Sequence, residues 1–360
     1  MEFTEERDLK YLTKLRKELI PCLPSFCADF FTGIGMRTTA LTRYNYGTDL
    51  KLFFDYMVSD GAPFSGMTAS DITVKDLEGL TKIDIERYLD YITAYYSSNK
   101  NAYLKNRDVT KSRKLSSIRS LFTYLYKSDM LSENVTLKVD MPKIREKEII
   151  RLEDDEVIDV LNEFGKSDTF LSDRKNSYNN NNTKIRDNAI LTLLLGTGIR
   201  VSECVGLNVK DIDFTNNSFT VTRKGEKRSI LYMSDDIAAV LSDYLDFRQA
   251  LLKKHRSEDP EALFLSLRDT RISVRAVELI VKKYAAEVTP LKKITPHKLR
   301  STYGTALYRS TKDIYVVAEV LGHKDINTTK KHYAAISEDI KKEAAGKVRF
   351  KPDNNPDSPL

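Results

Sequence analysis

The chain has 360 residues, more than one hydrophobic core usually serves, so two or more domains are expected. Its composition, 41% hydrophobic and 31% charged with 14 Gly and 10 Pro, excludes collagen-like, wholly disordered and disulfide-scaffold proteins. The net charge of +6 is by itself a weak indication of a nucleic-acid partner. No apolar run approaches the roughly 20 residues that span a bilayer, and residues 1–7 do not resemble a signal peptide. We therefore expect a cytoplasmic protein without a membrane partner.

The first part of the chain predicts helices. Leucines recur at helical spacing before Pro21 and Pro24, which makes residues 1–37 an N-terminal helical appendage. Apolar residues keep the helical period through residues 38–133, so this segment is expected to form a small helical bundle. Residues 134–148 show alternating charge and little periodicity, which is typical of an exposed linker between domains.

The second part of the chain predicts a mixed domain over residues 149–346, followed by a mobile tail at 347–360. Residues 166–184 are polar and rich in asparagine, which predicts a loop, and the apolar residues 185–195 predict a buried helix. The period then becomes alternating, which predicts a three-stranded antiparallel sheet. Its strands are expected at 212–214, 219–223 and 229–233, with helices following to about residue 340. The fold class is therefore mainly α with a small antiparallel β-sheet.

Positive charge is concentrated before and within one predicted helix of the first domain. Residues 99–120 contain a single acidic residue, Asp108. This segment either forms a solvated helix face or contacts DNA phosphates. Its candidate DNA-binding residues are Lys100, Lys105, Arg107, Lys111, Arg113, Lys114 and Arg119.

Cysteine and histidine usage argues against a metal site. The three cysteines, Cys22, Cys27 and Cys204, are an odd number in a long chain, so a disulfide framework is not expected. Cys22 and Cys27 have no further cysteine or nearby histidine to complete a zinc site. We expect neither a metal ion nor another cofactor.

A first candidate for chemistry lies in the sequence TPHKLR, residues 295–300. Pro296 suits the first position of a helix, so His297 and Arg300 are expected on one face of its first turn. The N-terminus of a helix also favours an anion. A histidine three residues before an arginine is common by chance, so this pair alone leaves a structural role open.

A second candidate lies in the sequence GTGIRVSE, where two glycines end the buried helix. Arg200 follows them, and Glu203 comes three residues later. The two side chains either form a local ion pair worth a few tenths of a kcal/mol or provide a guanidinium for phosphate together with the carboxylate that orients it.

Two further motifs carry candidate residues. The hairpin TRKGEKR presents Lys224 near its turn, although surface hairpins often carry lysine for solubility alone. The sequence LGH places His323 ten residues before Tyr333. One tyrosine among 19 would ordinarily belong to a core.

Five motifs in this order resemble the tyrosine recombinases. They are GTGIRVSE, RKGEK, TPHKLRSTYGTAL, LGHKDINTT and HYAAI, and the similarity runs over residues 149–340. Residues 38–132 resemble the helical, SAM-like core-binding domain of that family, with looser motifs. The resemblance implies a core-binding domain and a catalytic domain that form a C-shaped clamp on DNA.

The resemblance assigns roles residue by residue. Arg200 matches the first active-site arginine, Glu203 the acidic residue that accompanies it and Lys224 the hairpin lysine. The histidine and arginine pair is His297 and Arg300, the later histidine is His323, and Tyr333 matches the nucleophile. The interval from His323 to Tyr333 is one residue longer than in Xer members, but the neighbouring His332 does not disturb the register, since the nucleophile must be a hydroxyl. Cleavage through a 3′-phosphotyrosyl intermediate, strand exchange through a Holliday junction and independence of ATP follow from the resemblance.

The resemblance also implies partners. These are a double-stranded DNA recombination site, a homotetramer on DNA held through the C-terminal segment 337–348, and an accessory protein that the sequence leaves open. The function is Xer-like, in dimer resolution or in integration and excision of a mobile element. The alternatives are a type IB topoisomerase and a non-catalytic DNA-binding regulator with a recombinase fold.

Overall fold

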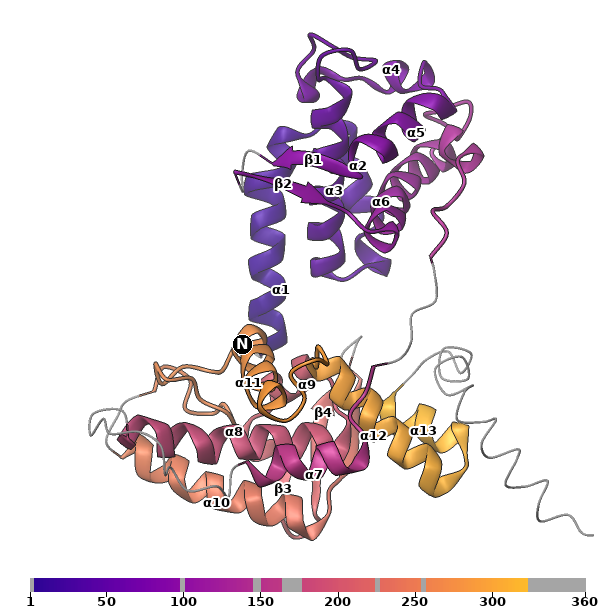
Figure 1. Ribbon diagram of the computed structural model, residues 1–360. Coiled ribbons are helices and arrows are strands. Elements are labelled where there is room, and N and C mark those ends of the chain that lie inside the picture. The colour runs from indigo at the N-terminus through magenta and orange to yellow at the C-terminus, as the bar shows by residue number, and fades with distance from the viewer. Residues whose placement is uncertain are drawn as a thin grey trace, which may run out of the picture. The chain divides into compact units, whose positions relative to one another are not determined.

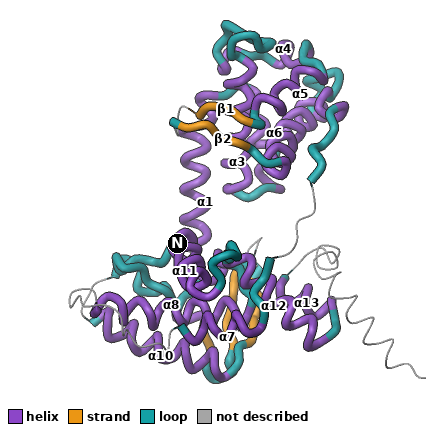
Figure 2. The backbone as a smooth tube through the Cα atoms, in the orientation of Figure 1, coloured by secondary structure: helices purple, strands orange, loops and turns teal. Residues whose placement is uncertain are grey.

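The computed structural model describes residues 3–97, 101–144, 150–163, 177–223, 227–253 and 257–322. The chain divides into two compact units, Met1–Lys147 and Glu148–Leu360 (Figure 1). Helices dominate the described residues of both units, and a small antiparallel sheet lies in each (Figure 2). The expected fold class is thereby confirmed. Among the described residues, no helix combines the length and the apolar character that a membrane span needs.

The first unit is built from helices around one aromatic core. Phe53, Phe54 and Tyr88 are fully buried, and Tyr88 packs edge-on against Phe53 at 5.1 Å between ring centroids. Thr81 and Asp84 form a capping box that fixes the start of one helix. The helices of the unit are α1 (Phe3–Lys14), α2 (Phe26–Gly33), α3 (Ala40–Met57), α4 (Val74–Glu78), α5 (Lys82–Tyr91) and α6 (Asp108–Lys127).

The N-terminal segment and part of the expected linker both pack on the first unit, which differs from the prediction. The N-terminal residues are part of the core and are not an appendage, because the apolar side chains of α2 and of the turn before it are buried in it, among them Leu23, Phe26 and Phe30. Part of the expected linker also packs on the unit. The short 3₁₀ helix Val135–Lys138 has a buried start, and Arg119 donates hydrogen bonds to carbonyl oxygens in and directly after it.

A β-hairpin interrupts the segment that was expected to be helical throughout. Strands β1 (Ala94–Ser97) and β2 (Ala102–Lys105) pair antiparallel, with Tyr96 opposite Tyr103. Asn101 adopts a left-handed backbone conformation with φ 48° at the turn. Aromatic residues favour strands, and asparagine tolerates this conformation better than most residues. These local preferences explain why the helical prediction is wrong here.

One buried carboxylate ties α3 to α6. The side chain of Asp49 is 1% exposed and accepts hydrogen bonds from Arg113, from Lys114 Nζ at 3.0 Å and from Ser117 Oγ at 2.8 Å. A buried charge is tolerated when it is paired and hydrogen-bonded, and here all partners come from one face of α6. Asp49 therefore fixes the packing of the two longest helices of this unit.

The second unit places helices around a three-stranded sheet. The sheet has the order β3-β4-β5, with strands β3 (Ile212–Asp213), β4 (Ser218–Thr222) and β5 (Arg228–Tyr232), which confirms the predicted hairpins. The helices are α7 (Asp154–Asn162), α8 (Ser177–Thr197), α9 (Val201–Gly206), α10 (Asp235–Leu252), α11 (Val274–Val288), α12 (Pro296–Thr311) and α13 (Ile314–Leu321).

Helix α8 is the buried centre of the second unit and packs against α10 and α12. It begins at Ser177, so the expected loop is helical over its last residues, where asparagines extend a helix that packing already stabilises. Gly196 is needed for close packing, because a Cβ there would lie 2.4 Å from the side chain of Ile237. The expected tail 347–360 and the expected helix near 328–340 lie outside the described residues.

We predict that Asp49→Ala lowers the stability of the first unit by about 3–5 kcal/mol, because it leaves the buried Lys114 ammonium without its carboxylate. Hydrogen exchange of α3 and α6 in the full chain measures this loss. Asp55→Ala, on the same helix and in an exposed pair with Lys51, is the matched control and should cost under about 1 kcal/mol. Equal exchange in both variants would contradict the role assigned to Asp49.

Candidate active site

The C-terminal turn of α13 accepts hydrogen bonds from three arginines that come from three different elements. The last carbonyl groups of a helix have no partner within it and carry partial negative charge, so they attract cations. Arg200 Nη2 donates to the carbonyl of Gly322 at 3.1 Å, and Arg300 Nη2 donates to that of Leu321. Arg223 Nη1 and Nη2 donate to Glu319 at 3.2 Å and to Val320 at 2.7 Å. Four consecutive carbonyl groups thus gather three guanidinium groups.

Glu203 holds Arg200 in place. Arg200 is the N-cap of α9, and its backbone N–H donates to Glu203 Oε2 at 2.8 Å. Its Nη1 donates to Glu203 Oε1, also at 2.8 Å. The carboxylate side chain is 5% exposed, whereas the Arg200 side chain is 39% exposed. The ion pair, one of the two alternatives that the sequence left open, is present, and its geometry orients a guanidinium that still reaches solvent.

Arg300 is buried between two chain segments. The residue is 7% exposed, and Nη1 donates to the carbonyl of Gly198 at 2.6 Å. Gly198 has φ +61° and ends α8, and a Cβ there would lie 2.3 Å from the ring of Tyr303 on α12. Only glycine therefore allows this turn to bring α8, α9 and α12 together around Arg300.

His297 lies on the same helix as Arg300, three residues earlier in the first turn of α12, and is exposed. Pro296 stands at the first helical position as predicted, and Thr295 occupies the N-cap without a capping bond from its side chain. Lys224, His323 and Tyr333 lie outside the described residues, although His323 directly follows Gly322 in sequence. The structure therefore brings Arg200, Glu203 and Arg300 together and leaves the other assignments as predictions.

Arg223 is the residue of this cluster that the sequence did not single out. Burial lowers its pKa from the usual arginine value, Glu203 raises it, and Arg200 lowers it further, so these three charged groups share one neighbourhood. The guanidinium remains a cation because the pKa of arginine starts above 12. The signal that could have found it is the charge of the motif RKGEK, in which it directly precedes Lys224.

Some of the candidate DNA-binding residues are exposed, and others are bound to partners within the first unit. Lys105 and Arg107 are exposed just before α6, and Lys111 is paired with Asp108 at 3.0 Å. Lys114 is 8% exposed and bound to Asp49, so its prediction as a phosphate contact is wrong. Two other arginines have structural partners: Arg113, which is half exposed, binds Asp49, and Arg119 donates to carbonyl oxygens after α6. Lys100 lies outside the described residues.

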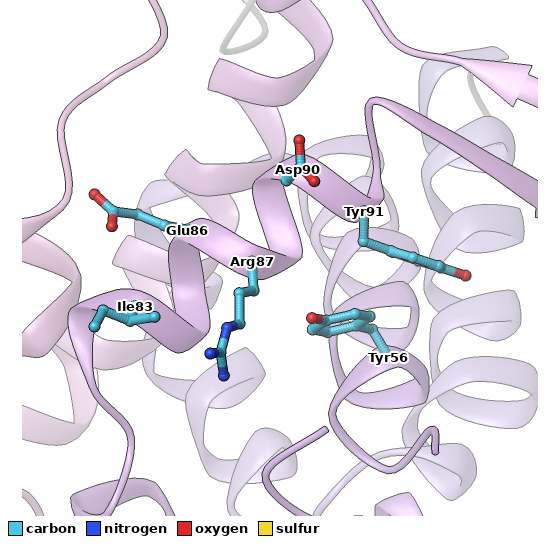
Figure 3. Close-up of a pocket in the computed structure, with 6 residues that line it drawn as sticks. All are labelled: Tyr56, Ile83, Glu86, Arg87, Asp90 and Tyr91. Atoms are coloured by element: carbon cyan, nitrogen blue, oxygen red, sulfur yellow. The ribbon is translucent and has the colours of Figure 1, made fainter. Parts of the chain in front are cut away.

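A surface hollow of about 550 Å³ lies in the first unit between α3 and α5 (Figure 3). The rings of Tyr56 and Tyr91 lie side by side there, 4.7 Å apart between centroids. None of the predicted site residues lines it. Its remaining lining residues are Ile83, Glu86, Arg87 and Asp90.

The part of the chain that the structure describes contains no group of three or more His, Cys, Asp or Glu side chains placed to hold a metal ion. Its cysteines are free thiols. Burial raises the pKa of Cys204 to about 12 and also raises that of Cys27, so both thiols stay protonated at neutral pH.

Comparison with known sequences gives consistent matches. Residues 170–339 match the model of the phage integrase family. Tyrosine recombinase XerC of Caldanaerobacter subterraneus subsp. tengcongensis is 32% identical over 358 residues, which cover 95% of this chain and 92% of that protein. Tyrosine recombinase XerS of Streptococcus thermophilus is 32% identical over 335 residues, which cover 85% of this chain and 90% of that protein.

Solved structures agree in fold. The XerH site-specific recombinase bound to its palindromic difH substrate in a post-cleavage complex has a TM-score of 0.62 at 18% identity, covering 85% of this chain and 80% of that one. A lambda integrase dimer bound to a COC′ core site has a TM-score of 0.57 at 16% identity, covering 86% and 94%. Since nearly a third of its residues match curated tyrosine recombinases over almost the whole length, the chain belongs to the tyrosine recombinase family and is a site-specific recombinase of the Xer type.

Proposed function

We propose that this recombinase cleaves duplex DNA with Tyr333 as the nucleophile while Arg200 and Arg300 hold the scissile phosphate. The observation that carries the proposal is the convergence of these two arginines on the last carbonyls of α13, one residue before His323. Attack on a phosphodiester needs positive charge at the non-bridging oxygens, and guanidinium groups bind phosphate in two-point geometry. A guanidinium has five N–H donors, so the bonds from Arg200 to Glu203 and Gly322 leave others for a ligand.

The other residues supply the proton transfers. The phenol of Tyr333 attacks phosphorus and forms a 3′-phosphotyrosyl bond, and its proton passes to a base, for which His297 is the candidate. The 5′-oxygen leaves and takes a proton from Lys224, the candidate general acid. Attack by a 5′-hydroxyl from a partner strand reverses the chemistry and joins the new strand, which gives a Holliday junction after one exchange. The phosphotyrosyl bond preserves the energy of the broken bond, so the reaction requires no ATP. The positive charge at the phosphate comes from the guanidinium groups of Arg200 and Arg300.

The partners follow from this chemistry. Both units contact a double-stranded recombination site, with Lys105 and Arg107 at phosphates in the first unit. Four copies assemble on DNA through the C-terminal segment 337–348, and an accessory protein is a further candidate partner. A substrate of chromosomal or plasmid DNA is consistent with a cytoplasmic location. Resolution of DNA dimers and integration or excision of a mobile element are the two roles that this chemistry serves.

A topoisomerase or a non-catalytic regulator would behave differently in two assays. Paired recombination sites yield Holliday junctions with a recombinase, whereas a topoisomerase relaxes supercoils without partner strands. A regulator binds DNA and forms no covalent adduct. The DNA for these assays is the site recovered by mapping sequences that the protein protects in its own genome.

We predict that Tyr333→Phe abolishes the covalent protein–DNA adduct on a nicked suicide duplex, because phenylalanine has no hydroxyl to attack phosphorus. Binding to the same duplex should persist. Tyr315→Phe, on the exposed start of α13, is the matched control and should form the adduct at the rate of the unmodified protein. An adduct that persists in Tyr333→Phe would exclude this tyrosine as nucleophile.

Arg200→Lys should slow single-turnover cleavage by about 10²–10³-fold, since lysine keeps the charge and loses the two-point geometry at the phosphate. The rate of adduct formation at saturating protein measures the effect. Arg275→Lys, at an exposed arginine paired with Glu278, is the control. Cleavage within about threefold of the control would show that Arg200 does not bind the phosphate in the transition state.

Arg107→Ala should lower the slope of log binding constant against log salt by about 1, because one phosphate contact releases about one counterion. Binding is measured at several salt concentrations. Lys127→Ala, in the last turn of α6, should leave the slope unchanged. An unchanged slope in Arg107→Ala as well would remove the start of α6 from the DNA interface.

A further inference from the structure

Arg223 connects the β4–β5 hairpin to α13, and its main chain belongs to the hairpin. It directly follows β4, and its backbone N–H donates to the carbonyl of Lys227 at 2.8 Å. The neighbouring pair, Thr222 opposite Arg228, is the last in the ladder. The position of this residue is therefore fixed by pairing between the two strands.

The side chain of Arg223 leaves the hairpin and lies against the end of α13. Its two terminal nitrogens reach the carbonyls of Glu319 and Val320, at 3.2 and 2.7 Å. Gly322, in a left-handed conformation with φ 62°, leaves room for it, because a Cβ at that residue would lie 2.2 Å from Arg223 Nη1. Glycine adopts this φ without strain, and a Cβ in its place would displace the Arg223 guanidinium from the end of α13.

This contact is not optimised for stability alone. Arg223 Nε is buried and has no hydrogen-bond acceptor among the residues that the structure describes. An unsatisfied buried donor costs free energy, so packing alone does not account for this position of the side chain. The contact also places a third cation beside Arg200, which like-charge repulsion opposes.

We propose that Arg223 is a positioning residue for DNA cleavage. By fastening the hairpin to the C-terminal turn of α13, it sets the position of the next residue, Lys224, relative to the phosphate held by Arg200 and Arg300. Lys224 can protonate the leaving 5′-oxygen only if it meets that oxygen while the phosphate is bound, since proton transfer depends on hydrogen-bond distance. The inference rests on the proposed function of Lys224 as the general acid.

The test uses two suicide duplexes that differ in one atom, the bridging 5′-oxygen or a sulfur in its place. A thiolate leaves without protonation, so the sulfur substrate does not need a general acid. Arg223→Gln keeps a polar side chain and loses the paired contact with α13. It should cleave the oxygen substrate about 30–100-fold more slowly than the unmodified protein, within the range that general acids contribute, and the sulfur substrate within about threefold of it.

Three results would overturn the inference. Equal slowing on both substrates with unchanged thermal unfolding means that Arg223 acts on the phosphate itself. Equal slowing together with a lower unfolding temperature means that it only supports the fold. Unchanged cleavage of the oxygen substrate means that the contact with α13 is dispensable. Arg228→Gln, an exposed arginine on the opposite strand, is the matched control and should cleave both substrates normally.

Lys224→Ala separates this inference from the function on which it rests. If the sulfur substrate restores cleavage by Lys224→Ala but not by Arg223→Gln, only the positioning role fails. If the sulfur substrate does not restore cleavage by Lys224→Ala, the general acid is another group and the proposed function of Lys224 fails. Arg223→Lys gives a graded comparison, because an ammonium can bind one of the two carbonyls at a time, and it should fall between the unmodified protein and Arg223→Gln on the oxygen substrate.

Discussion

The attraction between the carbonyl end of α13 and guanidinium groups is the interaction on which the second unit depends. Arg200, Arg223 and Arg300 come from α9, the β4–β5 hairpin and α12, which are far apart in sequence. Three cations would repel one another if they were brought together without a compensating field. The partial negative charge of a helix C-terminus and its unpaired carbonyls provide that field from main-chain atoms. Gly322, at the end of α13, makes room for Arg223.

A carboxylate that accepts a hydrogen bond from an arginine neutralises its positive charge, whereas a neutral carbonyl leaves that charge available to a ligand. In the first unit, Arg113 and Lys114 share the carboxylate of Asp49, which cancels one of their two charges. The acceptors on α13 are neutral carbonyls. Among the described residues of this cluster, the carboxylate of Glu203 binds one guanidinium, that of Arg200. The cluster therefore retains net positive charge, as the proposed phosphate site needs, and Arg200 in it still reaches solvent. The Asp49 network instead ties α3 to α6 through a buried carboxylate.

The sequence could predict the arrangements that depend on residues close together in the chain. The pair of Arg200 and Glu203 lies within one helical turn, and the position of Pro296 sets the start of α12, so motifs alone indicate these arrangements. The hairpins of the second unit follow from alternation of apolar residues. The contact of Arg223 could not be predicted, because its acceptors are main-chain carbonyls that carry no residue signature and lie 96 and 97 positions away. Lys114 was misjudged for a similar reason, since its partner is 65 positions away on α3.

Arg200 and Arg300 differ in burial, so the kinetics of their variants differ in what they report. Arg300 is held by carbonyls on both sides and closes the turn at Gly198, so replacing it removes buried hydrogen bonds that organise α8, α12 and α13 together. A variant of Arg300 that loses activity therefore loses it through a folding defect and a chemical defect together. Arg200 is held by Glu203 and one carbonyl, and more than a third of its side chain reaches solvent. A substitution that keeps its charge would change the geometry at the proposed phosphate site with little loss of buried contact. Kinetics at Arg200 therefore report on transition-state binding more directly than kinetics at Arg300.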